Sequence, residues 1–368
     1  MKTTTTLLAA CSLLSAASLT SWADTAYTDP VMASSTTIAG NGGSGISFSV
    51  IGFPALSSIE ATGVIDSIEG VDGDGYTTLV VTDVPSTWST NNFDAQGGVV
   101  EFNFRNVPLY YVEITSGDKE GQLFEVLATG SGASASMTVG ADLSGLDSAF
   151  SGATFAIRRK HTIGSVFGEN NEAGFRPGQN DTEADLIYNL YGGVFETIYY
   201  QDDQIGIFGD GWRVTGDFFT DASDVCIDPD FGVFVAKRDN NAINVVSVGD
   251  VKLGTARTAI VQGFNPVISK FPVSMTLGTC GLYDSENPVL TGGQNDTEAD
   301  LVYVLVNGQF IAYYYQVDQI GIFGSGWRKL GDFFADQSSV EIPSGAPVIV
   351  FRRSATPVEW VKMQPYVL

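Results

Sequence analysis

Basic residues are scarce in this chain, and their scarcity removes two classes of partner. The 368 residues include 18 Lys and Arg against 42 Asp and Glu, which gives a net charge of −24. That charge repels nucleic-acid phosphates and anionic lipid surfaces, so neither is expected as a partner. Long apolar runs are also missing after the first 23 residues, so the sequence predicts no transmembrane helix.

Histidine is scarcer still, because His161 is the only one. A Ser-His-Asp or Cys-His nucleophilic site would have to use it, yet it follows three cations, which disfavour an imidazolium at that position. We therefore expect a surface or strand-end histidine. Zinc needs several His or Cys ligands, and the chain lacks them. The sequence predicts no catalytic residue and a protein that is not an enzyme.

The first residues have the pattern of a secretory signal. Lys2 supplies a positive charge, an apolar stretch runs from residue 7 to 19, and Ser21 and Ala23 place small residues at the −3 and −1 positions of a cleavage site. We expect cleavage after Ala23 and export to the extracellular space, the periplasm or the outer cell envelope.

Two cysteines remain after such cleavage, Cys226 and Cys280. An exported chain with two cysteines permits one disulfide. However, Cys226 matches Glu341 in a second copy of its surroundings, which indicates an outward-facing strand position. Both the bonded and the free state therefore remain open.

That second copy is the main feature of the sequence. Gln179–Arg238 and Gln294–Arg353 align without a gap at an offset of 115 residues, and about 36 of the 60 pairs are identical. Both copies begin with QNDTEADL and continue through DQIGIFG, GWR and GDFF. Glycine pairs and Asn-Gly between alternating apolar runs predict hairpins in each copy.

The rest of the chain also has short alternating runs between turn signals and no helical periodicity. We predict an all-β protein, with an N-terminal β domain followed by two tandem β-meander repeats of sandwich- or barrel-like form. The expected boundaries are 1–23 for the signal, 24–164 for the N-terminal domain, 165–248 for repeat 1, 249–293 for a connecting segment and 294–368 for repeat 2.

Carboxylates recur at the start of each copy and allow a calcium site. On an extended segment, alternate acids share one face and offer the oxygen ligands that Ca²⁺ prefers. The competing interpretation is a polar turn that satisfies its own backbone. The candidate metal residues are Asp181, Glu183 and Asp185 in the first copy and Asp296, Glu298 and Asp300 in the second.

Aromatic residues are the candidate ligand-binding groups. Exposed rings would stack on sugars, whereas buried rings would form the core of a small β unit, which is the usual role of Trp and Tyr. The candidates are Trp212 and Tyr200 in the first copy and Trp327 and Tyr315 in the second.

Several motifs spread over nearly the whole chain resemble a known family. They include EITSGDKEGQLFEV from Glu113, IRRKHTIGSVFG from Ile157, GDVKLG from Gly249, FPVSMTLGTCGLY from Phe271 and the two TEADL…GWR units. They are similar to those of exported proteins of unknown function from Verrucomicrobia-type bacteria. The resemblance implies export and a common fold, but no activity and no catalytic residues.

Three functions follow as hypotheses. The favoured one is a structural or adhesive protein of the cell envelope, which binds other envelope proteins and is not an enzyme. The second is a carbohydrate-binding module for extracellular glycans, which requires solvent-facing Trp212 and Trp327. The third is a secreted hydrolase, which requires a cleft with converging carboxylates in one domain only.

Overall fold

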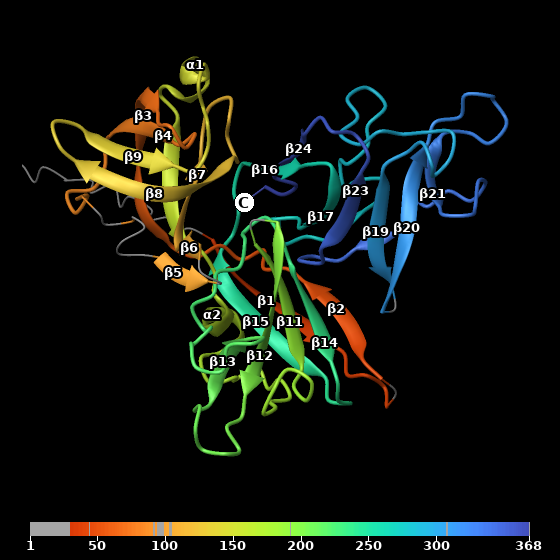
Figure 1. The fold of residues 1–368 in the computed structure, drawn as a ribbon. Coiled ribbons are helices and arrows are strands. Elements are labelled where there is room, and N and C mark those ends of the chain that lie inside the picture. The colour runs from red at the N-terminus through yellow and green to blue at the C-terminus, as the bar shows by residue number, and fades with distance from the viewer. Residues whose placement is uncertain are drawn as a thin grey trace, which may run out of the picture.

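The computed structural model describes residues 30–367, apart from 44, 91–92, 94–98, 103–104, 192 and 307. The predicted signal and the hairpin-tip residues Gly192 and Asn307 lie outside the described residues. Strands make up 44% of the described residues and helices 3%, so the all-β prediction is confirmed. Within the described part, no helix is long and apolar enough to span a membrane. Three lobes meet at the centre of the molecule (Figure 1).

The first lobe is a closed six-stranded barrel in the order β10-β3-β4-β9-β8-β7. Closure leaves these strands without open edges. Alternate side chains such as Ile65, Leu79, Val112 and Phe155 point inward and form one core. The strands are β3 (Ile59–Val71), β4 (Thr77–Thr82), β7 (Tyr110–Ile114), β8 (Leu123–Ser131), β9 (Ala135–Val139) and β10 (Thr154–Arg159). The lobe also holds α1 (Asp147–Phe150) and the hairpin of β5 (Val99–Phe102) and β6 (Arg105–Pro108).

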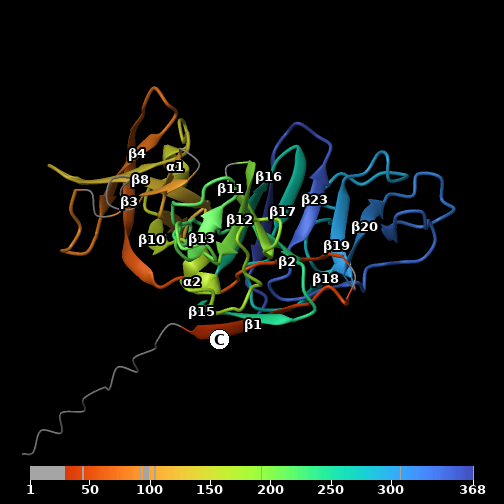
Figure 2. The ribbon, with the colours of Figure 1, turned by 60° about the horizontal axis from the view of Figure 1, so that its bottom comes forward.

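The second lobe, which we call unit 1, contains the first sequence copy. Its five-stranded sheet has the order β13-β12-β11-β14-β2, and β1 pairs with β15 in a separate ribbon that is also visible in Figure 2. The elements are β1 (Val31–Ile38), β2 (Ser47–Ile51), α2 (Ile163–Phe167), β11 (Leu186–Tyr191), β12 (Val194–Gln201), β13 (Gly211–Val214), β14 (Val233–Lys237) and β15 (Ile243–Asp250).

The third lobe, unit 2, contains the second sequence copy. Its main sheet has the order β17-β23-β19-β20-β21, and β16 pairs with β24. The elements are β16 (Thr255–Ile260), β17 (Gly263–Val267), β18 (Met275–Thr276), β19 (Leu301–Val306), β20 (Gln309–Gln316), β21 (Gly326–Lys329), β22 (Glu341–Ile342), β23 (Val348–Arg352) and β24 (Val358–Met363).

The strand registers of the two units correspond beyond the sequence copies. Ile51 pairs with Val233 in unit 1, and Val267 pairs with Val348 in unit 2. In the ribbons, Ile38 pairs with Ile243 and Ile260 pairs with Val358. Val348 lies 115 residues after its unit 1 counterpart Val233, and Val358 lies 115 residues after Ile243. Each unit therefore contains two strands that precede its sequence copy.

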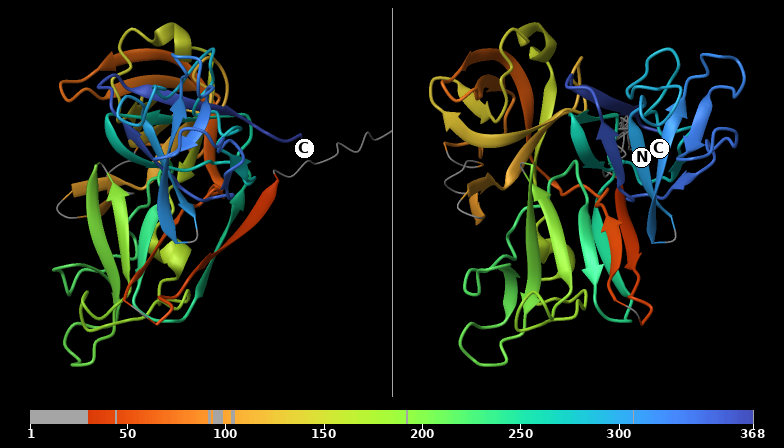
Figure 3. Two further views of the ribbon diagram at one scale, coloured as in Figure 1. Left: turned by 90° about the vertical axis from the view of Figure 1, so that its right-hand side faces the viewer. Right: turned by 45° about the vertical axis from the view of Figure 1, so that its right-hand side comes forward.

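These two added strands change the predicted domain boundaries. The predicted N-terminal domain, 24–164, divides in two, because β1 and β2 belong to unit 1 and only β3 to β10 build the barrel. The barrel is thus inserted between β2 and β11 (Figure 3). The apolar side of β2 completes unit 1, since Ile51 enters the core that also holds Val233 and Val235.

The predicted meander is also incomplete in each unit. After β13 the chain does not add another neighbouring strand, because β14 returns to the opposite edge of β11. The segment before β14 forms only one isolated bridge to an earlier part of the chain, between Cys226 and Thr162. This path lets β14 carry its buried Lys237 to the start of β11, a contact described below.

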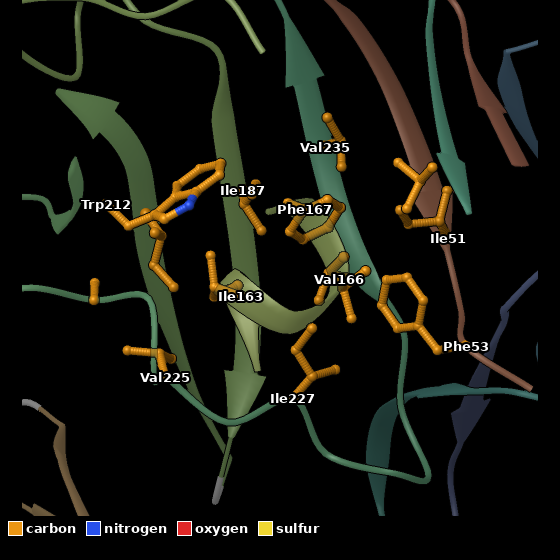
Figure 4. Packing of buried hydrophobic residues seen from close by; sticks show 14 of the residues in the cluster. Ile51, Phe53, Ile163, Val166, Phe167, Ile187, Trp212, Val225, Ile227 and Val235 are labelled. Carbon is orange, nitrogen blue, oxygen red and sulfur yellow. The ribbon is translucent and has the colours of Figure 1, made fainter. Parts of the chain in front are cut away.

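Unit 1 is held together by an aromatic and aliphatic core between its sheet and α2. Figure 4 shows Trp212 beside Ile187 and Ile163, with Phe167 of α2 nearby. Thr162 begins α2 as the N-cap, since its Oγ1 accepts from the Ser165 backbone N–H at 3.2 Å. The helix also anchors the segment after β13, because the Ile163 and Gly164 N–H groups donate to the Val225 and Ser223 carbonyls at 3.0 and 2.6 Å.

Candidate functional site

The two tryptophans are core residues and not sugar platforms. Trp212 is 0% exposed and Trp327 is 2% exposed. Trp212 packs edge-on against Phe175 at 5.8 Å, and its indole N–H donates to the Gly168 carbonyl at 2.8 Å. The sugar-stacking alternative for Trp212 and Trp327 therefore fails, and both rings fill the interior of a small β unit, as the residue types favoured.

The candidate tyrosines are half-buried and cover the tryptophans. Tyr200 meets Trp212 edge-on at 5.3 Å, and Tyr315 meets Trp327 at 5.7 Å. Tyr315 also stacks on Tyr283, with ring centres 3.6 Å apart. These ring contacts are internal, so the tyrosines take part in packing rather than forming an open platform.

The acids at the start of each copy separate into a buried group and a surface turn. Asp185 is buried, pairs with the Lys237 ammonium and accepts the backbone N–H groups of Arg176 and Arg238 at 2.7 Å. Asp300 repeats this arrangement with Arg352 at 3.2 Å. A carboxylate already neutralised by a buried cation is not available as a calcium ligand.

The remaining acids support the polar-turn interpretation. Glu183 accepts the Gln179 backbone N–H at 3.1 Å, and Glu298 accepts that of Gln294 at 2.9 Å. Asp181 contributes its main-chain carbonyl to Arg238, as Asp296 does to Arg353. Across the part of the chain that the structure describes, no group of three His, Cys, Asp or Glu side chains is placed to hold a metal ion.

Cysteine and histidine are both inward-facing. Cys226 and Cys280 are free and buried in the separate cores of units 1 and 2. Thus the disulfide alternative fails, and so does the inference from Glu341 that Cys226 faces outward. His161 is half-buried, and its Nε2 donates to the Ala55 carbonyl at 2.7 Å. Burial lowers the pKa of His161, which favours the neutral ring.

The most exposed large apolar side chains of both copies lie in the loops after β12 and β20 and in the turns after β13 and β21. We call Ile205, Ile207 and Phe219 tip 1, and Ile320, Ile322 and Phe334 tip 2. Ile207 is 68% exposed and Ile322 69%, while Phe219 and Phe334 are 69% and 72% exposed. Large apolar side chains at this level of exposure, repeated at matching positions, are typical of a recognition surface.

Hydrogen bonds from the backbone to one carboxylate hold each loop in shape. The Asp203 carboxylate accepts the backbone N–H groups of Gly206, Phe208 and Gly209 at 2.7–2.9 Å. These bonds, led by that of Gly209, hold the pKa of Asp203 below its ordinary value. Asp318 accepts the matching N–H groups of unit 2 at 2.7–3.2 Å. Each loop is therefore closed around one carboxylate.

A buried arginine joins this loop to the turn that carries the exposed phenylalanine. Arg213 donates from Nε to the Phe218 carbonyl at 3.0 Å and from Nη2 to the Gly209 carbonyl at 3.1 Å. Arg328 makes the same bonds to Phe333 and Gly324, at 3.0 and 2.9 Å. Because the planar guanidinium spans both segments, the isoleucines and the phenylalanine of a tip are held together.

The two tips differ in charge. Residues 202–221 hold five Asp and one Arg, which gives −4, whereas residues 317–336 hold three Asp, one Arg and one Lys, which gives −1. The loops lie at the outer ends of units 1 and 2 and face different directions (Figure 1). Apolar side chains with an acidic surround suit a partner that is apolar with a basic rim.

Sequence reasoning identified these loops only as glycine-rich connections. The identical DQIGIFG and GDFF motifs were the signal, since a plain connection does not need two isoleucines and two phenylalanines. No protein-family model, curated protein or solved structure matches the chain.

Proposed function

We propose that the protein is an exported structural or adhesive protein that bridges two partners through tip 1 and tip 2, without catalysing a reaction. The observation that carries the proposal is the repetition, at one offset, of an exposed apolar triad held by a carboxylate and a buried arginine. Such rigid support reduces the entropy that binding costs. The partner is an envelope protein with an apolar surface and a basic rim.

Bridging follows from the placement of the tips. Because the loops lie on different lobes and face different directions, one chain engages two separate surfaces. Where two partner-bearing surfaces lie close together, binding at one tip holds the other tip near the second surface, which raises the apparent affinity well above that of one tip. The resemblance to exported proteins supports the envelope as the place where these partners occur.

The test compares binding of the purified chain to envelope fractions of the producing cells. In one variant Ile205 and Ile207 become Ser, in a second Ile320 and Ile322 become Ser, and a third combines both changes. The matched control is Val246→Ser with Val248→Ser, which removes similar exposed apolar area from β15. We expect each tip variant to lose binding by about 100-fold through lost avidity and the combined variant to lose it entirely.

Two results would overturn the proposal. The first is wild-type binding by the combined variant. The second is an equal loss in the Val246 and Val248 control, which would indicate non-specific adsorption of apolar surface. Folding of every variant is checked by its melting temperature, which should stay at the parent value because exposed substitutions change stability by about 0.5 kcal/mol or less.

A further inference from the structure

Unit 1 contains a cavity that lies away from both tips. Its volume is about 350 Å³, and it lies where the end of β10, the start of α2 and β15 meet. His161, Ser165, Glu169 and Ser247 are among the residues that line it. The Ser247 side chain is 7% exposed, and its Oγ has no hydrogen-bond partner among the described residues. A buried hydroxyl without a partner is unfavourable, so its presence here indicates a ligand.

Unit 2 shows what occupies the matching position. Lys362 lies 115 residues after Ser247, and both face inward between exposed neighbours. The Lys362 ammonium donates to the Thr279 carbonyl at 3.3 Å. The internal lysine of unit 2 thus corresponds to open space and a hydroxyl in unit 1.

The surrounding backbone is equivalent in the two units. Thr162-Ile163-Gly164-Ser165 in unit 1 corresponds to Thr276-Leu277-Gly278-Thr279 in unit 2. The Ile163 N–H donates to the Val225 carbonyl at 3.0 Å, and the Leu277 N–H donates to the Val340 carbonyl at 3.0 Å. The carbonyl of Ser165 is therefore the counterpart of the Thr279 carbonyl that accepts the lysine.

The uncommitted groups around the unit 1 cavity are acceptors. The Glu169 carboxylate lies over Gly164, where a Cβ would come within 2.6 Å of its Oε1, and it has no partner among the described residues. His161 donates from Nε2 to Ala55, which leaves Nδ1 as an acceptor. The two cations at the cavity are already paired, Arg159 with Asp224 at 3.6 Å and Lys160 with Glu125 at 2.6 Å.

We propose that this cavity binds a small ligand with a primary ammonium group, which takes the place that Lys362 fills in unit 2. The ammonium is bound by the Glu169 carboxylate and the Ser165 carbonyl, and the Ser247 hydroxyl gains its missing partner. The rest of the ligand is short, such as a diamine or an amino sugar, because the cavity holds only a small molecule. The proposal is independent of the function of the tips.

Isothermal titration calorimetry with cadaverine in about 0.15 M NaCl tests the proposal, because that salt screens non-specific attraction to the acidic surface. We expect saturable 1:1 binding with a Kd of about 1 mM, a usual range for so small a ligand. Ser247→Lys should abolish binding, since it reproduces the lysine of unit 2 and fills the cavity. Glu169→Gln should weaken binding at least about 10-fold, by loss of a charge-assisted hydrogen bond.

The controls separate this site from general charge effects. Glu172→Gln removes an acid from the same loop outside the cavity and should leave the Kd unchanged. Glucose, a neutral ligand of similar size, should not bind. The proposal is overturned by absence of saturable cadaverine binding, by full binding in Ser247→Lys, or by glucose binding as well as cadaverine. Because Glu169 is exposed, Glu169→Gln keeps the test valid even if Ser247→Lys does not fold.

Discussion

Units 1 and 2 have the same strand order and register, yet they differ at the centre of the molecule. Unit 1 holds the inserted barrel and the turn Asp228-Pro229-Asp230, where unit 2 has Pro343-Ser344-Gly345. Asp230 binds the Lys270 ammonium of unit 2 at 2.5 Å, so the acidic turn of unit 1 connects the lobes. The shared parts therefore maintain one frame and one kind of tip, whereas the divergent parts fix how the lobes meet.

The same comparison separates structural positions from functional ones. The Asp185–Lys237 and Asp300–Arg352 pairs keep their geometry although the cation changes, which is expected when a buried carboxylate only needs a positive partner. By contrast, Ser247 and Lys362 differ in size and charge, and Ser247, the smaller residue, lines a cavity of about 350 Å³. A difference of that kind changes what the unit binds rather than how it folds.

Replacing the core tryptophans should have the largest effect and tests whether the two frames are equally stable. Trp212→Ala and Trp327→Ala should each cost about 3–5 kcal/mol, because each removes a large buried ring. We expect the larger loss at Trp212, since the Gly168 carbonyl also loses the indole N–H. Urea unfolding measures both. Variants that unfold like the parent would show that the rings do not contribute to the core.

The sequence was sufficient for much of this frame. The offset of 115 residues, the all-β class and the first hairpin of each copy followed from local patterns. Those patterns alternate apolar residues and contain turn residues such as Gly193 and Gly308, which have the positive φ that the turns require. The residue types also favoured the interpretation of Trp212 and Trp327 as core residues, and both are buried.

The rest depended on contacts between distant segments. That β2 pairs with β14 across more than 180 residues has no local signal, so the N-terminal boundary was predicted wrongly. Cys226 appeared outward-facing because Glu341 occupies the same position, but in the structure β6 covers Cys226, whose Sγ lies 4.0 Å from the Pro108 carbonyl. Likewise, no local pattern predicts the cavity at Ser247, because distant segments at β10, α2 and β15 form it together.

The acidic turn of unit 1 should give a smaller, pH-dependent effect that unit 2 lacks. Burial, with the neighbouring charge of Asp230, raises the pKa of Asp228 to about 7. The folded protein therefore binds a proton that the unfolded chain has released. The stability from this group is present below the unfolded pKa of about 4 and is lost as the pH rises through 7.

Asp228→Asn should remove that dependence. Between pH 6.5 and 8, the parent should lose about 2–4 °C of melting temperature relative to Asp228→Asn, which corresponds to about 1 kcal/mol. Burial lowers the pKa of His161, but both proteins contain this residue, so its titration cancels in the comparison. Parallel melting curves for the two proteins across this window would contradict the assignment.

The last prediction concerns the two cysteines, one in each unit, for which we expect that a reductant has no effect on stability. Cys226 and Cys280 lie in different cores, and burial raises the pKa of each thiol to about 11. Oxidation and exchange need the thiolate, so both thiols should stay reduced and react with Ellman's reagent only after unfolding. Added dithiothreitol should then leave the melting temperature unchanged. A drop of several degrees would mean that the two thiols form a disulfide, which the separation of the two cores does not allow.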